Sequence, residues 1–223
     1  MKNHTGPKNQ TISHRLFIAC VAALSVVFTV SSPRPSHADY IEPPTVPTDI
    51  RVPAGNQLFL VGHAEGTQQY ICLKPGTTTP WVLFGPQATL FDDDGRQIIT
   101  HFLSPNLSPN DPLGSGTPRP TWQHSKDNSA VWAKKKAESS DSNFVEPGAI
   151  PWFLLEVVGD QDGPTGGDKL SPTTFIHRVN TSGGVAPSTG CAELAQVGQR
   201  MFVPYAADYF FYKPKRGHAH EDD

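Results

Sequence analysis

Short apolar runs separated by proline and glycine constrain this chain more than any other feature of its sequence. The 223 residues contain 22 prolines and 19 glycines, and many of these residues fall between apolar runs such as 57–63, 81–84 and 150–158. Such runs are too short for typical helices and suit strands. About ten strand candidates follow one another with antiparallel turn signals, which predicts an all-β sandwich or barrel. At most one short helix is expected, over 190–198.

Turn signals predict which strands are neighbours. Asp92–Gly95 contains Asp-Gly between two alternating runs, which favours a hairpin because both central residues of that turn need positive φ. Three consecutive aspartates also suggest calcium, but the spaced oxygen ligands and closing glutamate of an EF-hand are missing, so we prefer a solvated turn. A second turn is predicted at Lys126–Asn128. A third, at Ala64–Thr67, would make 57–63 and 68–73 a hairpin.

The N-terminus has the order of a secretory signal peptide. Three basic residues precede the apolar run 16–30, and Ser36-His37-Ala38 provides small residues at a cleavage site. The run is shorter than the roughly 20 residues of a membrane span, which disfavours an anchor, and lipid attachment at Cys20 is a weaker alternative. The expected domains are a signal peptide at 1–38, a proline-rich arm at 39–52, one β-rich domain at 53–213 and a disordered tail at 214–223.

Charge excludes some partners. Loss of residues 1–38 removes four basic residues and no acidic one, so the net charge changes from −3 to −7. A mildly acidic protein is not drawn to nucleic acid or anionic lipid by its long-range field. We therefore predict no nucleic-acid partner and, after cleavage, no integral membrane segment. The expected location is secreted or periplasmic.

Two cysteines, Cys72 and Cys191, remain after the predicted cleavage. In an oxidising compartment two such residues usually pair, so we predict a disulfide, with two separate buried thiols as the alternative. The bridge would close a loop of more than a hundred residues. The chain-entropy treatment gives about 4–5 kcal/mol for such a loop as an upper guide.

The strand predicted at 173–180 carries the most informative polar residues. Alternation places His177 with Phe175 and Val179 on one face, where a buried, hydrogen-bonded histidine is commoner than a catalytic one. Arg178 lies on the other face. Because a guanidinium keeps its charge and needs an acceptor, we predict a structural ion pair with Glu156 or Asp208.

No catalytic residue can be assigned from the sequence. Weak candidates for a polar cleft are His63, His101, His177, Glu156 and Asp208. There is no G-x-S-x-G nucleophile motif and no phosphate-binding glycine loop, so neither an activated serine nor a nucleotide cofactor is predicted. No metal site is expected, although His218 and His220 in the tail could hold a metal loosely. Trp81, Trp122, Trp132 and Trp152, with Tyr205, Tyr209 and Tyr212, could stack on sugars, but buried packing is commoner.

Several segments are similar to one known family. They are VPAGNQLFLVGHAEGTQQYICL, PTWQHSKDNSAVWAK, IPWFLLEVV, FIHRVNTSGGVAPSTGC and VPYAADYFFY, and they cover most of residues 47–213. The chain thereby resembles an uncharacterised family of secreted proteins, domain of unknown function 3455. The resemblance implies an exported domain with both cysteines in matching segments, and it implies no activity or catalytic residues.

The leading functional hypothesis is a non-enzymatic exported β-domain that binds a ligand or a surface, for instance a glycan. The alternatives are a secreted hydrolase with a polar cleft and a structural envelope protein. A hydrolase should bring two or three of the candidate histidines and acids together at the floor of one cleft. A binding module should instead expose tryptophans or tyrosines in a row and scatter those residues.

Overall fold

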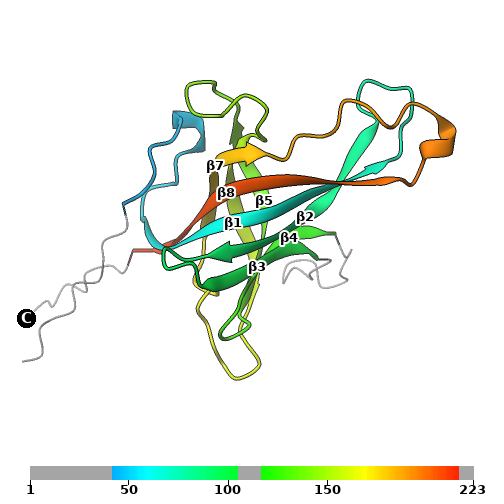
Figure 1. Cartoon of the computed structure of the whole chain (residues 1–223). Coiled ribbons are helices and arrows are strands. Elements are labelled where there is room, and N and C mark those ends of the chain that lie inside the picture. The colour runs from blue at the N-terminus through cyan, green and yellow to red at the C-terminus, as the bar shows by residue number, and fades with distance from the viewer. Residues whose placement is uncertain (1–41, 105–116, 216–223) are drawn as a thin grey trace, which may run out of the picture. The chain divides into compact units, whose positions relative to one another are not determined.

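Eight antiparallel strands form a closed barrel in the computed structural model, which describes residues 42–104 and 117–215 (Figure 1). Each strand pairs with the next along the chain, and the last returns to pair with the first. The strands are β1 (Asn56–Cys72), β2 (Trp81–Phe91), β3 (Gln97–Ser104), β4 (Arg119–His124), β5 (Ala130–Ser139), β6 (Trp152–Gln161), β7 (Phe175–Gly183) and β8 (Arg200–Pro214). This confirms the predicted all-β antiparallel fold, with eight strands in place of about ten.

Two short 3₁₀ helices, η1 (Thr48–Ile50) and η2 (Leu194–Gln196), are the helical elements of the described ranges. The short helix predicted over 190–198 is thus reduced to a single turn. No helix in the part of the chain that the structure describes is both long and apolar enough to cross a membrane. The predicted signal peptide and most of the tail lie outside the described residues, as does 105–116 of the irregular stretch between β3 and β4.

The strand count is lower because three predicted breaks are absent. β1 continues through Ala64–Thr67, where the sequence suggests a turn, β2 joins the runs 81–84 and 87–91, and β8 continues through Pro204. The glycine in the first break serves close packing, since a Cβ on Gly66 would lie 2.2 Å from the carbonyl oxygen of Gln87 on β2. Glycine is therefore required here by the neighbouring strand, and the chain does not reverse.

The other two turns are as predicted. Asp92–Gly95 joins β2 to β3, and Asp92 Oδ1 accepts hydrogen bonds from the backbone N–H groups of Asp94 and Arg96 at 3.1 and 2.9 Å. The turn at Lys126–Asn128 joins β4 to β5, with Asn128 at a φ of 59°. Both turns follow from the ability of Asp, Asn and Gly to bond their own backbone or adopt left-handed conformations.

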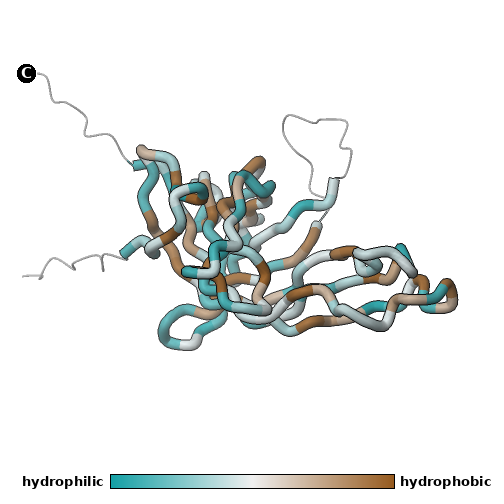
Figure 2. The backbone as a smooth tube through the Cα atoms, turned by 90° about the horizontal axis from the view of Figure 1, so that it is seen from above, coloured by the Kyte–Doolittle hydropathy of each residue, from teal (hydrophilic) through white to brown (hydrophobic). Residues whose placement is uncertain are grey.

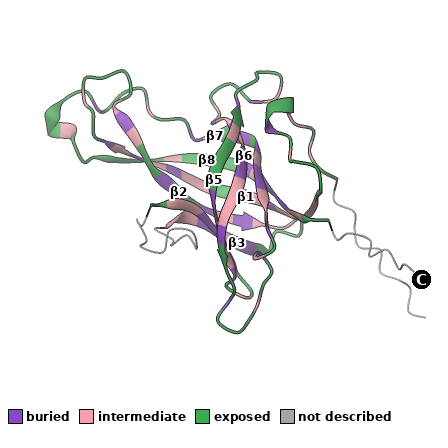
Figure 3. Ribbon diagram, turned by 180° about the vertical axis from the view of Figure 1, so that it is seen from behind, coloured by how far each residue is buried: buried purple, intermediate pink, exposed green. Residues whose placement is uncertain are grey.

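The main core draws buried residues from all eight strands, and Figure 3 shows buried stretches along the strands of the barrel. Trp122 is fully buried at the centre and meets Tyr209 and Phe211 edge-on, with ring centroids 5.6 and 6.4 Å away. A smaller core lies outside the barrel, where η1 buries Ile50 against Trp152 and Phe210. Packing on both faces explains why the first part of β6, WFLLEVV, is almost continuously apolar.

Part of the sheet extends beyond the closed barrel. The pairing of β2 with β3 ends at Gln87, and the pairing of β7 with β8 ends at Tyr205. Beyond these points β1 still pairs with β2 on one side and with β8 on the other, which gives a three-stranded open sheet (Figure 1). We call its residues, 67–86 and 185–204, the extension. The Cys72–Cys191 disulfide is present there with a sequence separation of 119 residues, as predicted. It packs with Tyr70 and Trp81 in a small cluster of its own.

The extension also holds what we call the apolar patch. Figure 2 shows hydrophobic stretches along this projecting part of the tube. Beside the buried cluster, the extension carries the exposed large hydrophobic residues that make up this patch: Leu73, Leu83, Phe84, Val185, Leu194, Val197, Met201 and Phe202.

Candidate functional site

A pocket of about 360 Å³ lies where the barrel meets the extension, which provides five of its lining residues. All eight strands contribute to its lining, which places it on the inner face of the closed sheet. Its polar lining residues are Gln68, His101, Trp122, Lys135, Arg178 and Tyr209. Its apolar lining residues are Leu83, Phe84, Leu103, Phe153 and Leu155, with Gly85 and three prolines. The volume is within the range of small-molecule sites.

Arg178 of β7 provides the main charge in this pocket. Its guanidinium lies over the Phe153 ring at 3.9 Å and donates from Nη2 to the backbone oxygen of Pro151 at 2.8 Å. Burial lowers the pKa of Arg178 from its ordinary value, while the neighbouring Tyr209 hydroxyl opposes that shift. The group remains a cation, because an arginine pKa starts above 12. Its Nε is buried and has no hydrogen-bond partner among the described residues.

Two further buried donors lie around the same pocket. Gln68 Nε2 on β1 and Trp122 Nε1 on β4 have no hydrogen-bond partner among the described residues. Both side chains are almost fully buried, at 2% and 0% exposure. A buried N–H group without an acceptor costs about 1–3 kcal/mol, so three of them around one cavity call for an explanation.

His101 of β3 is a neutral part of the wall. Its Nδ1–H donates to the backbone oxygen of Thr121 at 2.9 Å, and its ring stacks on Trp122 with centroids 4.2 Å apart. Burial lowers the pKa of His101 from 6.5 to about 3. At neutral pH the other ring nitrogen, Nε2, therefore carries a lone pair and can only accept a hydrogen bond.

The predicted ion pair of Arg178 is not formed with either acid that we proposed. Glu156 pairs instead with Lys134 and Lys136 on β5, at 3.3 and 3.0 Å. Asp208 accepts from His63 and Asn180, at 2.6 and 2.7 Å. The physical reason is the direction of the side chain. Arg178 points into the barrel, where a backbone carbonyl and tyrosine hydroxyls take the place of a carboxylate.

Among the five candidate histidines and acids, the structure brings together His63 and Asp208. These residues are direct partners across β1 and β8, and Asp93 from the β2–β3 turn accepts from the other ring nitrogen of His63 at 2.9 Å. The hydrogen bonds to Asp208 and then Asp93 raise the pKa of His63. When the ring is protonated, both nitrogens can donate to these carboxylates, so neither nitrogen is free to act as a general base on another molecule.

His177 lies elsewhere, beneath η1. Its Nε2–H donates to the backbone oxygen of Ile50 at 2.7 Å, and Nδ1 accepts from the Tyr212 hydroxyl at 3.1 Å. Burial lowers the pKa of His177, consistent with a neutral ring. It is 2% exposed and hydrogen-bonded, as its strand alternation predicts, and it anchors the arm to the barrel.

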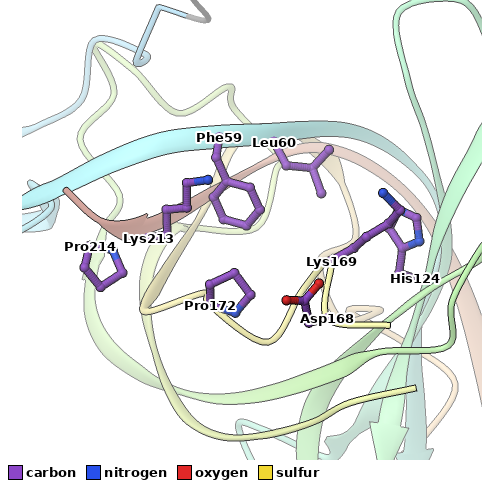
Figure 4. A pocket seen from close by; sticks show the side chains of 8 residues that line it. All are labelled: Phe59, Leu60, His124, Asp168, Lys169, Pro172, Lys213 and Pro214. Atoms are coloured by element: carbon purple, nitrogen blue, oxygen red, sulfur yellow. The ribbon is translucent and has the colours of Figure 1, made fainter. Parts of the chain in front are cut away.

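A second, more polar pocket of about 540 Å³ lies near the start of β1 and the end of β8 (Figure 4). Phe59 and Pro172 face each other across it, with Lys213, Lys169, Asp168 and His124 around the rim. Lys213 already lies over the Phe59 ring at 5.0 Å. No buried donor without a partner lines this pocket in the described residues, so it makes a weaker candidate for a specific site.

The described residues contain no group of three His, Cys, Asp or Glu side chains that could hold a metal ion. The tail histidines, His218 and His220, lie outside the described residues.

Sequence reasoning missed Gln68, Trp122 and Tyr209 as members of one pocket. The only available signal was a glutamine in a strand at alternate spacing from Tyr70 and Cys72. The four tryptophans are all buried, at 6% exposure or less, and so are Tyr205, Tyr209 and Tyr212, so none forms an exposed stacking row.

The fold and the site together define a class of protein, a closed antiparallel β-barrel with a partly apolar pocket on its inner face. The chain belongs to a family described as "Protein of unknown function (DUF3455)", whose model matches residues 53–213. No curated protein and no solved structure matches the chain.

Proposed function

We propose that this protein is an exported binding protein whose barrel pocket takes a small, mainly apolar molecule with an anionic, acceptor-rich head such as a carboxylate. One observation carries the proposal: Gln68, Trp122 and Arg178, on three different strands, leave buried N–H donors without acceptors around one cavity. A ligand that brings only acceptors would satisfy all three. The apolar walls formed by residues such as Leu103 and Leu155 would contact the rest of the molecule.

Charge supports an anion over a neutral acceptor. The described lining contains two cations, Arg178 and Lys135, and no acid. Lys135 is partly compensated by Glu138 at 2.6 Å, so Arg178 is the main uncompensated charge. Hydrogen bonds to ionised groups contribute about 1.5–3 kcal/mol, roughly twice a neutral bond.

The distribution of the other polar groups supports binding over hydrolysis. His101 faces the pocket with a pKa near 3, far too low for a general base at neutral pH. The histidine–acid pair that the hydrolase hypothesis could use, His63 with Asp208, does not line the pocket. A nucleophile and a general base close together at the floor of the cavity would have favoured the hydrolase hypothesis over binding.

Matched ligands test the proposal. Aromatic and medium-chain carboxylates should raise the melting temperature of the protein and quench its tryptophan fluorescence, whereas alcohols with the same apolar body should do so far less. Arg178→Gln should weaken carboxylate binding roughly tenfold to a hundredfold, as expected for loss of a charge-assisted bond. Arg96→Gln, at an exposed turn outside the pocket, is the control. Equal binding of carboxylates and alcohols by the natural protein would refute the proposal.

Export is a separate part of the proposal. The disulfide is compatible with an oxidising compartment, and the basic-apolar-small order of residues 1–38 supports cleavage. Intact-mass measurement of the protein recovered from outside the cytoplasm should give a chain that begins at Asp39. A mass that retains residues 1–38 would contradict it.

A further inference from the structure

One side chain in the pocket wall has an acceptor to offer and no donor. His101 of β3 lines the pocket, and its Nδ1–H donates to the backbone oxygen of Thr121 at 2.9 Å. A neutral imidazole carries a single ring proton, so this hydrogen bond fixes the tautomer. Nε2 is therefore the acceptor nitrogen of the ring.

This acceptor has no partner within the described protein. The structure records no hydrogen bond to Nε2 of His101 among the described residues, and Nε2 is not one of the atoms that the protein encloses completely. The residue as a whole is only 2% exposed, so the open side of Nε2 faces the pocket that the ring lines. A lone pair shielded from bulk water in this way is a position for a donor that arrives with the ligand.

The neighbouring rings hold the imidazole but do not supply that donor. Trp122 stacks on His101 with centroids 4.2 Å apart and planes 11° apart, so its N–H lies parallel to the imidazole and does not point at it. Tyr209 carries the only hydroxyl among the described lining residues, and that hydroxyl lies 3.3 Å from the Tyr205 hydroxyl and next to Arg178. The acceptor is thus fixed in place and left for another molecule.

The imidazole keeps this role throughout the physiological pH range. Burial lowers the pKa of His101 from 6.5 to about 3, against the hydrogen bond to Thr121, and the charge of Arg178 adds to the lowering. Protonation would make Nε2 a donor and would put a second positive charge beside that guanidinium. At neutral pH the wall therefore presents an acceptor here.

The acceptor and the main cation approach the pocket from opposite walls. His101 lies on β3 and Arg178 on β7, which are half-way round the closed eight-stranded barrel from each other. The charge of Arg178 still affects His101, so the distance to be bridged is short. An anion placed at Arg178 can thus reach Nε2 with a donor on the far side of a small apolar body.

We propose that His101 is a specificity-determining residue of the pocket, whose Nε2 accepts a hydrogen bond from a hydroxyl of the bound carboxylate. The ligand class is accordingly a small hydroxycarboxylic acid whose hydroxyl is remote from its acid group. The inference rests on the proposed function and refines it, since the anionic head alone leaves Nε2 without a donor. A site built around a hydroxyl disfavours the analogue that lacks it, because the buried acceptor then stays unpaired.

Calorimetric titration of the purified chain with benzoate and its derivatives tests the inference. At least one of 3- and 4-hydroxybenzoate should bind roughly tenfold more tightly than benzoate. The corresponding methoxybenzoates, which cannot donate, should show no such gain. Nor should 2-hydroxybenzoate, whose hydroxyl bonds its own carboxylate. The preference should hold from about pH 5 to about pH 8, because His101 stays neutral there.

Variants assign the preference to one residue. His101→Phe should bring the hydroxybenzoates and benzoate within about twofold of each other, because only the hydroxyl contact is lost. His101→Gln, whose amide oxygen can accept, should retain part of the preference. His63→Gln, outside the pocket, should keep all of it. Unchanged near-ultraviolet circular dichroism shows that a variant is folded, and the ligand series on the natural protein decides the matter if His101→Phe is not.

The outcomes separate this inference from the proposed function. Equal binding of benzoate, methoxybenzoates and hydroxybenzoates would overturn the role of His101 and leave the anion site intact. A hydroxyl preference that persists in folded His101→Phe would also overturn it. Phenol that binds as tightly as the hydroxybenzoates, and more weakly to His101→Phe, would refute the anionic head while supporting the hydroxyl contact. Absence of binding by every compound would refute both.

Discussion

The barrel and the extension share three strands but are stabilised in different ways. In the barrel, β1, β2 and β8 have partners on both sides and enclose a core around Trp122. In the extension the same strands form an open sheet with a small cluster, a disulfide and an exposed apolar patch. Closure satisfies strand edges and buries apolar area, whereas an open sheet must obtain its stability from a covalent bond or from contact with another surface.

The largest expected effect compares two phenylalanines of β8. Phe211 is fully buried in the barrel, and Phe202 is 55% exposed in the extension. Phe211→Ala should lower the free energy of unfolding by about 3–5 kcal/mol, because it leaves a cavity. Phe202→Ala should change it by no more than about 0.5 kcal/mol. Urea unfolding measures both, and similar losses would erase the distinction between the two regions.

Removal of the disulfide should have the next largest effect. Replacing Cys72 and Cys191 together by serine should cost about 2–4 kcal/mol, mainly because the unfolded chain gains freedom. Hydrogen exchange should then become faster in the extension first, since there the bridge replaces missing strand partners. If exchange accelerates equally in β3 and β4, the extension is not the region that depends on the bridge.

The barrel holds its own long loop, 162–172, without a covalent link. The Asp127 carboxylate accepts from Ser129 N and Ser129 Oγ at 3.1 and 2.8 Å and from Lys169 N at 2.9 Å. Asp127→Ala should therefore cost about 1–3 kcal/mol, because part-buried donors lose their acceptor. Asp127→Asn, which keeps one carbonyl acceptor, should cost less. Equal losses in thermal unfolding for the two variants would contradict this role.

Histidines inside and outside the barrel should give opposite pH dependence. His101 has a folded pKa of about 3 against an ordinary 6.5, so below pH 6.5 the unfolded chain takes up a proton that the folded protein does not. Stability should fall as the pH drops from 6.5 towards 3, by about 1.4 kcal/mol per pH unit at most. His101→Phe should flatten this acid limb in urea titrations, and an unchanged limb would exclude His101 as its source.

His63 should act in the other direction and more weakly, because its side chain is only half-buried. Its folded pKa is raised by Asp208 and Asp93, so its contribution is complete below the ordinary pKa of 6.5 and is lost as the pH rises through the raised value. His63→Gln should remove this small loss of stability on the alkaline side. NMR titration of the His63 ring should give a pKa above 6.5, and a value at or below 6.5 would contradict the link.

The fold was largely predictable from the sequence because turn chemistry is local. The Asp-Gly in Asp92–Gly95 and the apolar run 150–158 predicted a hairpin and a strand, and both are present, the strand as β6 from Trp152. The errors arose where a local signal had a non-local cause. Gly66 resembles a turn residue in the sequence, yet it is required by the Gln87 carbonyl of a neighbouring strand, which only the assembled sheet brings near.

The pocket was less predictable because it is made by closure. Its six polar residues come one each from six different strands, and Gln68 and Arg178 are more than a hundred positions apart in the sequence. Strand alternation showed that Arg178 needed an acceptor. It could not show that Glu156 would face the lysines of β5, because the facing residues depend on the register and on bulges of β5 against β6.

β1 runs unbroken for 17 residues, from the end of the arm through the barrel wall to the disulfide. The barrel and the extension are therefore not separate modules, because a truncation that removes the extension also removes part of a barrel strand. Gln68 lies on that strand within the extension, so the pocket takes one of its unpartnered donors from the segment that the disulfide holds. Loosening the extension should therefore also disturb the pocket.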